Sequence, residues 1–214
     1  MMKSPAAPPH NCPLCPRLKA FRDANRAKYP DWFNGPVPSF GPLTARILIA
    51  GLAPGLQGAN RTGRPFTGDW AGDLLYATLL KHGLAKGMYE ERADDSLELL
   101  DCRIANAVRC VPPQNKPEPS EIKTCRQFLK SELENLPNVK VILALGKIAH
   151  DSVLTTLGAK ISAHPFKHGV SYDVGRFKLI SSYHCSRYNT NTGRLTTAMF
   201  EDVVEKAKGL ASKF

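Results

Sequence analysis

Four short runs of apolar residues recur along the chain, at residues 46–52, 102–108, 139–145 and 177–183. Each run is nearly continuous, and continuous apolar runs of this length are typical of β-strands that are covered on both faces. The pattern therefore predicts four buried strands.

Amphipathic helical patterns fill the intervals between these runs. Ser120 precedes the second pattern and can cap that helix. The apolar residues at helical spacing form three sets: Leu74, Leu75, Leu79 and Leu80; Ile122, Leu129, Leu133 and Leu136; and Leu195, Met199, Val203, Ala207 and Leu210. Strands that alternate with helices imply right-handed crossovers and a mostly parallel sheet. We predict an α/β protein, a three-layer α/β/α fold with a central four-stranded, mostly parallel sheet.

The domain organisation follows from length and composition. The 214 residues favour one domain over 1–214, and the proline-rich residues 1–40 are expected to wrap around it. No apolar run approaches the roughly 20 residues of a membrane-spanning helix, and the N-terminus lacks a secretory signal. We expect a soluble cytoplasmic monomer with no membrane partner.

The charge balance adds a candidate partner. The chain carries 29 Lys and Arg against 19 Asp and Glu, a net charge of +10. Basic residues that neutralise phosphates gain affinity through counterion release, so the excess is compatible with nucleic-acid binding. A merely solvated positive face explains the charge equally well.

Six cysteines add candidate chemistry, because thiols in a reducing compartment stay reduced and clusters of them suggest metal binding. Cys12 and Cys15 form a C-x-x-C motif, and Cys110 and Cys125 flank a proline-rich loop. Four thiolates suit either tetrahedral zinc or an iron–sulfur cluster, and the spacing does not choose between them. Cys102 falls outside the set and is expected to be a small buried hydrophobe.

A glycine-rich segment, GLAPGLQGANRTGRPFTGDWAG, follows the first predicted strand. Such a segment lets backbone amides approach a ligand closely, although it matches neither a Walker A loop nor a dinucleotide fingerprint. It holds one carboxylate, Asp69, and one exposed-looking aromatic residue, Phe66, beside Trp70. The alternative interpretation is a surface loop in which Asp69 only caps a helix.

Two further strand ends carry polar side chains. His184 follows the fourth predicted strand and precedes a polar loop, and Asn106 in the second has an amide that can both donate to and accept from a nucleobase edge. Ligands of parallel α/β sheets bind at the carboxyl ends of the strands. The unusual residues of this chain therefore gather where a ligand site is expected.

Three motifs carry a resemblance to a known family. The segments GLAPGLQGANRTGRPFTGD, IANAVRCVPPQNKP and YHCSRYNTNTGRLT, together with the four-cysteine frame, resemble the UDGb class, family 5 of the uracil-DNA glycosylase superfamily. The resemblance implies a [4Fe–4S] cluster on Cys12, Cys15, Cys110 and Cys125. Related cluster-bearing glycosylases have an acid where this chain has Leu52, so the catalytic carboxylate moves to Asp69. The usual proline after the motif histidine is replaced by Cys185, which frees a backbone N–H.

The implied function is monofunctional DNA base excision in repair, acting on uracil and on other deaminated bases such as hypoxanthine in nucleoid DNA. Extrusion of the nucleotide precedes cleavage of the N-glycosidic bond and leaves an abasic site. Asp69 stabilises the sugar cation and aligns water, and His184 donates to the departing base. We expect base contacts from Ala53, Pro54, Gly55, Phe66 and Asn106, and DNA contacts from Asn60, Arg61, Arg64, Arg187, Tyr188 and Asn189.

Two competing functions are left open. A non-enzymatic iron–sulfur or zinc protein that binds nucleic acid would explain the charge and the cysteines, but it assigns no role to Asp69 or His184. A nucleotide hydrolase would require a cluster of metal-binding carboxylates, and only Asp69 lies near the glycine-rich segment.

Overall fold

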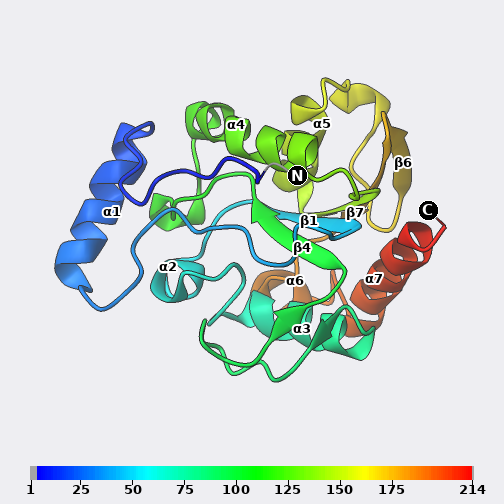
Figure 1. The fold of residues 1–214 in the computed structure, drawn as a ribbon, viewed down its shortest axis with the longest axis horizontal. Helices are drawn as coiled ribbons and strands as arrows, with labels where there is room; N and C mark the ends of the chain where they lie inside the picture. Colours follow the sequence, from blue (N-terminus) through cyan, green and yellow to red (C-terminus); the bar gives the residue numbers. More distant parts are fainter. Residues whose placement is uncertain (1–3, 214) are drawn as a thin grey trace.

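The computed structural model describes residues 4–213, and its centre is a five-stranded sheet (Figure 1). The strand order is β4 (Cys102–Asn106), β1 (Ile47–Gly51), β5 (Val141–Leu145), β7 (Phe177–Ser182) and β6 (Ser171–Val174). The first four strands are parallel, and they are the four that the apolar runs predict. The α/β class and the mostly parallel sheet are thus confirmed.

The predicted number of strands is wrong by one. β6 pairs antiparallel with β7, with Val174 opposite Phe177 across a turn at Gly175. β6 is an edge strand of sequence SYDV with one buried residue, so it shows no continuous apolar run. Only its pairing with β7 identifies it as a strand.

Two pairs of helices cover the two faces of the sheet. Apolar residues of α3 (Trp70–Lys81) and α7 (Thr197–Ala211) pack on one face, and those of α4 (Pro119–Asn135) and α5 (Lys147–Thr156) pack on the other. Figure 1 shows α4 and α5 above the sheet and α3 below it. Adjacent strand residues alternate between the faces: Ile49 belongs to the first core and Leu48 to the second.

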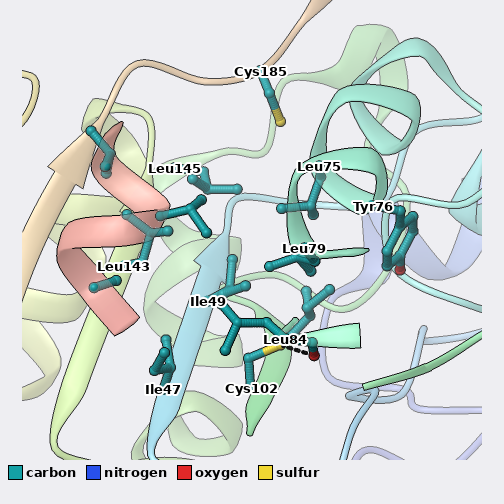
Figure 2. Close-up of a cluster of buried hydrophobic side chains, with 14 of the residues drawn as sticks. Ile47, Ile49, Leu75, Tyr76, Leu79, Leu84, Cys102, Leu143, Leu145 and Cys185 are labelled. Carbon is teal, nitrogen blue, oxygen red and sulfur yellow. Dashed lines mark hydrogen bonds between the residues drawn. The ribbon is translucent and has the colours of Figure 1, made fainter. Parts of the chain in front are cut away.

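Two cysteines belong to the first core rather than to a metal site (Figure 2). Cys102 is fully buried beside Ile49 and Leu84, and its thiol donates to the Leu84 carbonyl at 3.5 Å. Cys185, also fully buried, points its sulfur toward this core. The expectation that Cys102 is a small buried hydrophobe is confirmed.

Two predicted helix details are corrected. α4 begins at Pro119 and is capped by Glu118, which forms a reciprocal capping box with Glu121, so Ser120 lies inside the helix. A proline at the first helical position fixes a suitable φ, and the helix starts two residues earlier than a cap at Ser120 would give. Leu195 packs in the core, but α7 begins only after the cap at Thr196.

The N-terminal segment contributes a helix that the composition did not reveal. α1 (Pro16–Lys28) lies outside the three layers, at the left of Figure 1. The chain then returns to the sheet, where Val37 N–H donates to the Arg109 carbonyl and Phe40 bridges antiparallel to Ile104. Residues 1–3 of the predicted 1–40 wrap lie outside the described part of the chain.

The remaining elements are short and lie in the loops. They are α2 (Ala59–Thr62), β2 (Ala85–Lys86), β3 (Glu98–Leu99), η1 (Pro113–Asn115), η2 (Ile161–Ala163) and α6 (Arg187–Asn191). β2 and β3 pair as a small antiparallel ladder beside α3. Over residues 4–213, no helix is long and apolar enough to cross a membrane.

Candidate functional site

A cavity of about 340 Å³ opens where β1, β4 and β7 end. We call it the strand-end cavity. Its walls come from five separate stretches of chain: Leu52, Ala53, Pro54, Gly55 and Ala59; Phe66, Asp69, Trp70 and Ala71; Asn106; Asn115; and His184, Ser186 and Arg187. The two predicted catalytic residues and all five predicted base contacts therefore line one space.

Asp69 caps α3 and also faces the cavity. Its Oδ1 accepts the Gly72 N–H at 3.2 Å, while Oδ2 lies so close to Gly58 that a Cβ on that residue would be 2.3 Å away. Burial raises the pKa of Asp69, and hydrogen bonds from the amides of Gly72 and Ala71 oppose that shift. The Gly72 cap goes to Oδ1 while the carboxylate also lines the cavity, so the capping and catalytic interpretations are compatible.

His184 lies against the Phe66 ring, with centroids 5.9 Å apart and planes inclined by 27°. Burial lowers the pKa of His184 to about 4, because no neighbouring anion compensates the loss of water around the charged ring. The imidazole is therefore neutral at pH 7. The backbone carbonyl of His184 accepts a hydrogen bond from the Asn189 side-chain amide at 2.9 Å, which connects the histidine to α6.

Asn106 presents an unused acceptor to the cavity. The residue is 3% exposed, and its Oδ1 is buried without a hydrogen-bond partner in the structure. Buried polar atoms are rarely left unpaired, since each costs about 1–3 kcal/mol of desolvation. Gly51 makes room for this amide, because a Cβ there would lie 2.3 Å from Asn106 Oδ1 and 2.9 Å from the Phe66 ring.

The rim of the cavity carries aromatic and cationic side chains from α3 and α6. The Arg187 guanidinium lies 5.6 Å from the centre of the Trp70 ring, and Trp70 Nε1 donates to Thr190 Oγ1 at 2.9 Å. Tyr188, on α6, is 71% exposed. Arg61, on α2, is also exposed. An exposed cation and exposed rings beside an open cavity suit contact with a polyanion that bears stacked bases.

Three expectations for the glycine-rich segment are corrected. Asn60 is fully buried and donates to Asn34 Oδ1 at 2.9 Å, so it cannot reach DNA. Arg64 is buried in an ion pair with Asp95. Phe66 is 7% exposed rather than an open surface ring. Residue types in a loop do not reveal burial, because partners distant in sequence supply it.

Sequence reasoning left six lining residues out of the site: Leu52, Ala59, Trp70, Ala71, Asn115 and Ser186. All but Asn115 lie within two residues of a predicted residue, so their proximity in sequence was the available signal. Asn115 comes from the proline-rich loop between two cysteines and has a left-handed backbone, with φ of 56°. No pattern in the sequence distinguishes it.

The four predicted ligand cysteines line a second, smaller cavity between α1 and α4. We call it the cysteine cavity; it includes Cys12, Cys15, Cys110 and Cys125. The Arg22 guanidinium donates to Cys110 Sγ at 3.6 Å, and the Arg109 backbone N–H donates to Cys125 Sγ at 3.3 Å. Within residues 4–213, no three Cys, His, Asp or Glu side chains are placed to hold a single metal ion.

Comparison with known proteins gives a consistent family. Residues 38–208 match the uracil DNA glycosylase superfamily model. The chain is 49% identical over 208 residues to a type-5 uracil-DNA glycosylase of Thermus thermophilus, covering 94% of each chain. A type-5 uracil-DNA glycosylase of Pyrobaculum aerophilum is 39% identical over 92% of this chain and 88% of its own, and one of Mycobacterium bovis is 41% identical over 94% and 78%. The chain therefore belongs to the uracil-DNA glycosylase superfamily, with the type-5 proteins among its relatives.

Proposed function

We propose that the protein excises uracil from DNA by hydrolysing the N-glycosidic bond. One observation carries the proposal: a carboxylate, a neutral imidazole, an unpaired amide oxygen and an aromatic ring line the strand-end cavity together. These groups match the needs of base recognition, base departure and stabilisation of the sugar. The relatives in Thermus thermophilus and Pyrobaculum aerophilum are named as uracil-DNA glycosylases, which supports the same reaction.

Asp69 serves the sugar side of the reaction. Glycosidic cleavage builds positive charge on the sugar, and a carboxylate held in a half-buried site stabilises that charge more strongly than it would in water. Oδ2, flanked by Gly55 and Gly58, can also accept a proton from the attacking water. The helix cap on Oδ1 fixes the orientation of the group.

His184 serves the departing base. Negative charge grows on the base as the bond breaks, and a neutral imidazole N–H can donate to the carbonyl oxygen that receives this charge. The pKa of about 4 supports a donor that stays neutral and does not transfer its proton to the base. Phe66 offers a ring for stacking, already packed against His184.

Asn106 serves recognition, and its chemistry supports a range of deaminated bases. Its side-chain amide accepts through Oδ1 and donates through Nδ2, which complements an adjacent N–H and C=O. Uracil and hypoxanthine both present this lactam edge. We therefore extend the proposal to hypoxanthine, with Ala53, Pro54 and Gly55 forming the wall beside the base.

The reaction is proposed to stop at the abasic site. Cleavage of the strand by a bifunctional glycosylase needs an amine nucleophile, and no lysine lines the strand-end cavity among the described residues. Water aligned by Asp69 is then the nucleophile. We propose that the enzyme acts as a monomer on nucleoid DNA in the cytoplasm.

The cysteine cavity is proposed to hold a [4Fe–4S] cluster. The four cysteines line one space between α1 and α4, and four thiolates are the ligand set of such a cluster. Arg22 and Arg109 are buried beside these thiols, and each has an unpaired Nε, so cations are available to offset thiolate charge. The cluster would staple α1 to α4 and take no part in hydrolysis.

A base-release assay tests the proposal against the binding-only alternative. Labelled duplexes with one uracil or one hypoxanthine are incubated with excess protein and then treated with alkali to reveal abasic sites. Alkali-dependent cleavage supports base excision, and the ratio of the two rates measures the breadth of the site. Tight binding without base release favours the non-enzymatic nucleic-acid-binding protein.

A further inference from the structure

Phe66 has a strained backbone at the centre of the strand-end cavity. Its φ is 53°, a left-handed conformation that bulky residues rarely adopt. Such a conformation is unfavourable for a residue with a side chain and persists only where surrounding contacts enforce it. The ring that faces His184 is therefore held in place by something other than local preference.

The enforcing contacts come from two tyrosines. The Tyr89 hydroxyl accepts the Gly68 N–H at 3.1 Å and donates to the Phe66 carbonyl at 3.4 Å. The Tyr76 hydroxyl donates to the Pro65 carbonyl. The two tyrosine hydroxyls thus form hydrogen bonds with the backbone of Pro65, Phe66 and Gly68. These bonds hold the chain on both sides of the Phe66 Cα and at the residue before Asp69.

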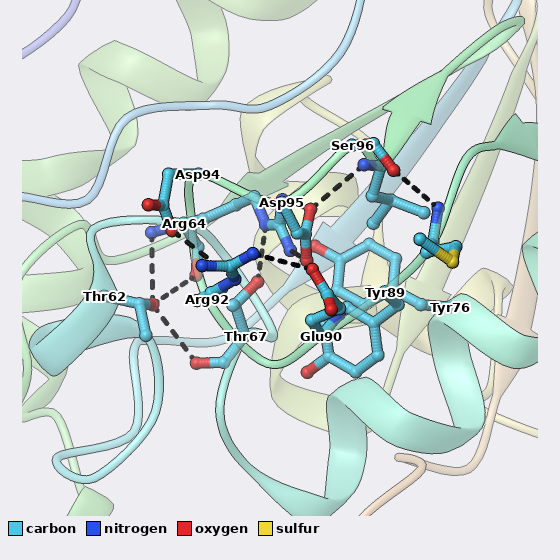
Figure 3. A network of polar contacts seen from close by, with 12 residues as sticks. Thr62, Arg64, Thr67, Tyr76, Tyr89, Glu90, Arg92, Asp94, Asp95 and Ser96 are labelled. Atoms are coloured by element: carbon cyan, nitrogen blue, oxygen red, sulfur yellow. Dashed lines mark hydrogen bonds and ion pairs between the residues drawn. The ribbon is translucent and has the colours of Figure 1, made fainter.

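Tyr89 belongs to the segment between β2 and β3, and one buried ion pair fixes that segment (Figure 3). The Asp95 carboxylate receives both terminal nitrogens of Arg64 at 2.6 and 2.7 Å, and it accepts the backbone N–H groups of Glu90 and Leu97 at 2.9 and 3.0 Å. The side chains of Arg64 and Asp95 are 5% and 0% exposed.

Arg64 connects this ion pair to the loop that carries Phe66 and to the rings of Tyr76 and Tyr89. Its Nε donates to Thr67 Oγ1 at 2.8 Å, and its guanidinium lies 5.5 Å from the centre of the Tyr76 ring and 5.8 Å from that of Tyr89. Burial alone would raise the pKa of Asp95, but hydrogen bonds from Arg64 and two amides lower it to about 2. The pair stays charged across the working pH range.

We propose that Tyr89, fixed by the buried Arg64–Asp95 pair, is a positioning residue that holds the Phe66 ring and the start of α3 in their working places. The inference rests on the proposed base excision and adds to it a set of residues that contact neither base nor sugar. Arg64, expected to bind phosphate, acquires a different role.

Tyr89→Phe is the sharpest test, because it removes one hydroxyl and keeps the ring packed against Tyr76, whose centroid is 4.7 Å away. The matched control is Tyr172→Phe on the edge strand β6, whose hydroxyl likewise donates to a proline carbonyl, that of Pro165. We expect the single-turnover rate of uracil release to fall about tenfold in Tyr89→Phe, since small misplacements of reacting groups are costly. The protein concentration at half-maximal rate should stay unchanged, and Tyr172→Phe should match the wild type.

Asp95→Asn provides a second variant with its own control. Asp101 also accepts two nitrogens of an arginine, Arg46, together with a backbone N–H, but it lies just before β4, at the opposite end of that strand from the cavity. If Asp95 contributed to stability alone, Asp95→Asn and Asp101→Asn would both have a lower melting temperature. Neither variant would then lose single-turnover rate per folded molecule. The proposal requires that Asp95→Asn alone lose rate per folded molecule.

A crystal structure of Tyr89→Phe decides the matter independently of activity. We expect the Phe66 ring to leave its contact with His184 or to show alternative conformers. An unmoved Phe66, or a wild-type rate of uracil release in Tyr89→Phe, overturns the inference. Absence of uracil release from the wild-type protein would instead overturn the proposed reaction, while the Phe66 conformation in the crystal would still test the positioning.

Discussion

The strand-end cavity and the cysteine cavity gather reactive side chains in opposite ways. The strand-end cavity is open, lies at the ends of three strands and is lined by Asn106, whose buried amide oxygen has no hydrogen-bond partner in the structure. The cysteine cavity is small and lies between α4 and the peripheral helix α1. It is flanked by buried arginines. Openness and unpaired acceptors suit a passing substrate, whereas enclosure and buried counter-charges suit a permanent group.

Neutralising the carboxylate of the strand-end cavity tests whether this cavity carries out the reaction. We expect Asp69→Asn to slow uracil release at least about 100-fold, a loss typical for removal of one preorganised charged group. Asparagine is as good a helix cap as aspartate, so folding and DNA binding should persist. Single-turnover release and a binding titration measure both effects.

Asp73→Asn is the matched control for that variant. Asp73 lies in the first turn of the same helix but is exposed, so its rate should remain within about twofold of the wild type, as for surface changes remote from a site. An Asp69→Asn protein with the wild-type rate would refute the assignment of the carboxylate.

The next variant tests the cysteine cavity. Cys110→Ser should remove most of the bound iron and the brown colour, and it should lower the melting temperature, because the staple between α1 and α4 is lost. Iron and sulfide analysis of protein purified without oxygen makes the measurement. Cys102→Ser, in the first core, should lose stability but keep its iron. Zinc in place of iron would show that the cofactor assignment is wrong.

The pH dependence of the rate separates His184 from an ordinary histidine. With a pKa of about 4, His184 stays neutral well below the usual midpoint of 6.5, so its donor is intact across neutral pH. Base release should therefore show no step near pH 6.5. Activity should decline only in acid, where Asp69, with its raised pKa, takes up a proton before an exposed aspartate would. A midpoint near 6.5 that disappears in His184→Gln would contradict this.

The smallest expected effect concerns the rim. Arg187→Ala should weaken DNA binding by a few-fold to about tenfold and reduce the slope of log affinity against log salt by roughly 0.9, the loss of one phosphate contact. Titrations at several salt concentrations measure the slope. Lys130 lies on the exposed face of α4, away from the cavity. Lys130→Ala is the control, and it should leave the salt slope unchanged. An unchanged slope in Arg187→Ala would place the DNA elsewhere.

The layers of the fold can be predicted from the amino-acid pattern alone. Runs such as 141–145 are apolar throughout, and a chain can bury such a run on both faces only as a central strand between helices. The topology of parallel strands then places Asp69, Asn106 and His184 at one edge of the sheet. That much of the candidate site follows from local pattern and chain order.

Which polar residues are exposed to solvent is known only from the tertiary structure. Asn60, Arg61 and Arg64 are close in sequence and all polar. Asn60 is buried with a hydrogen bond to Asn34, and Arg64 is buried in an ion pair with Asp95, whereas Arg61 is exposed. The edge strand β6 likewise exists through its pairing with β7 and not through its own sequence. Burial and pairing depend on partners tens of residues away, and no local pattern encodes the position of those partners.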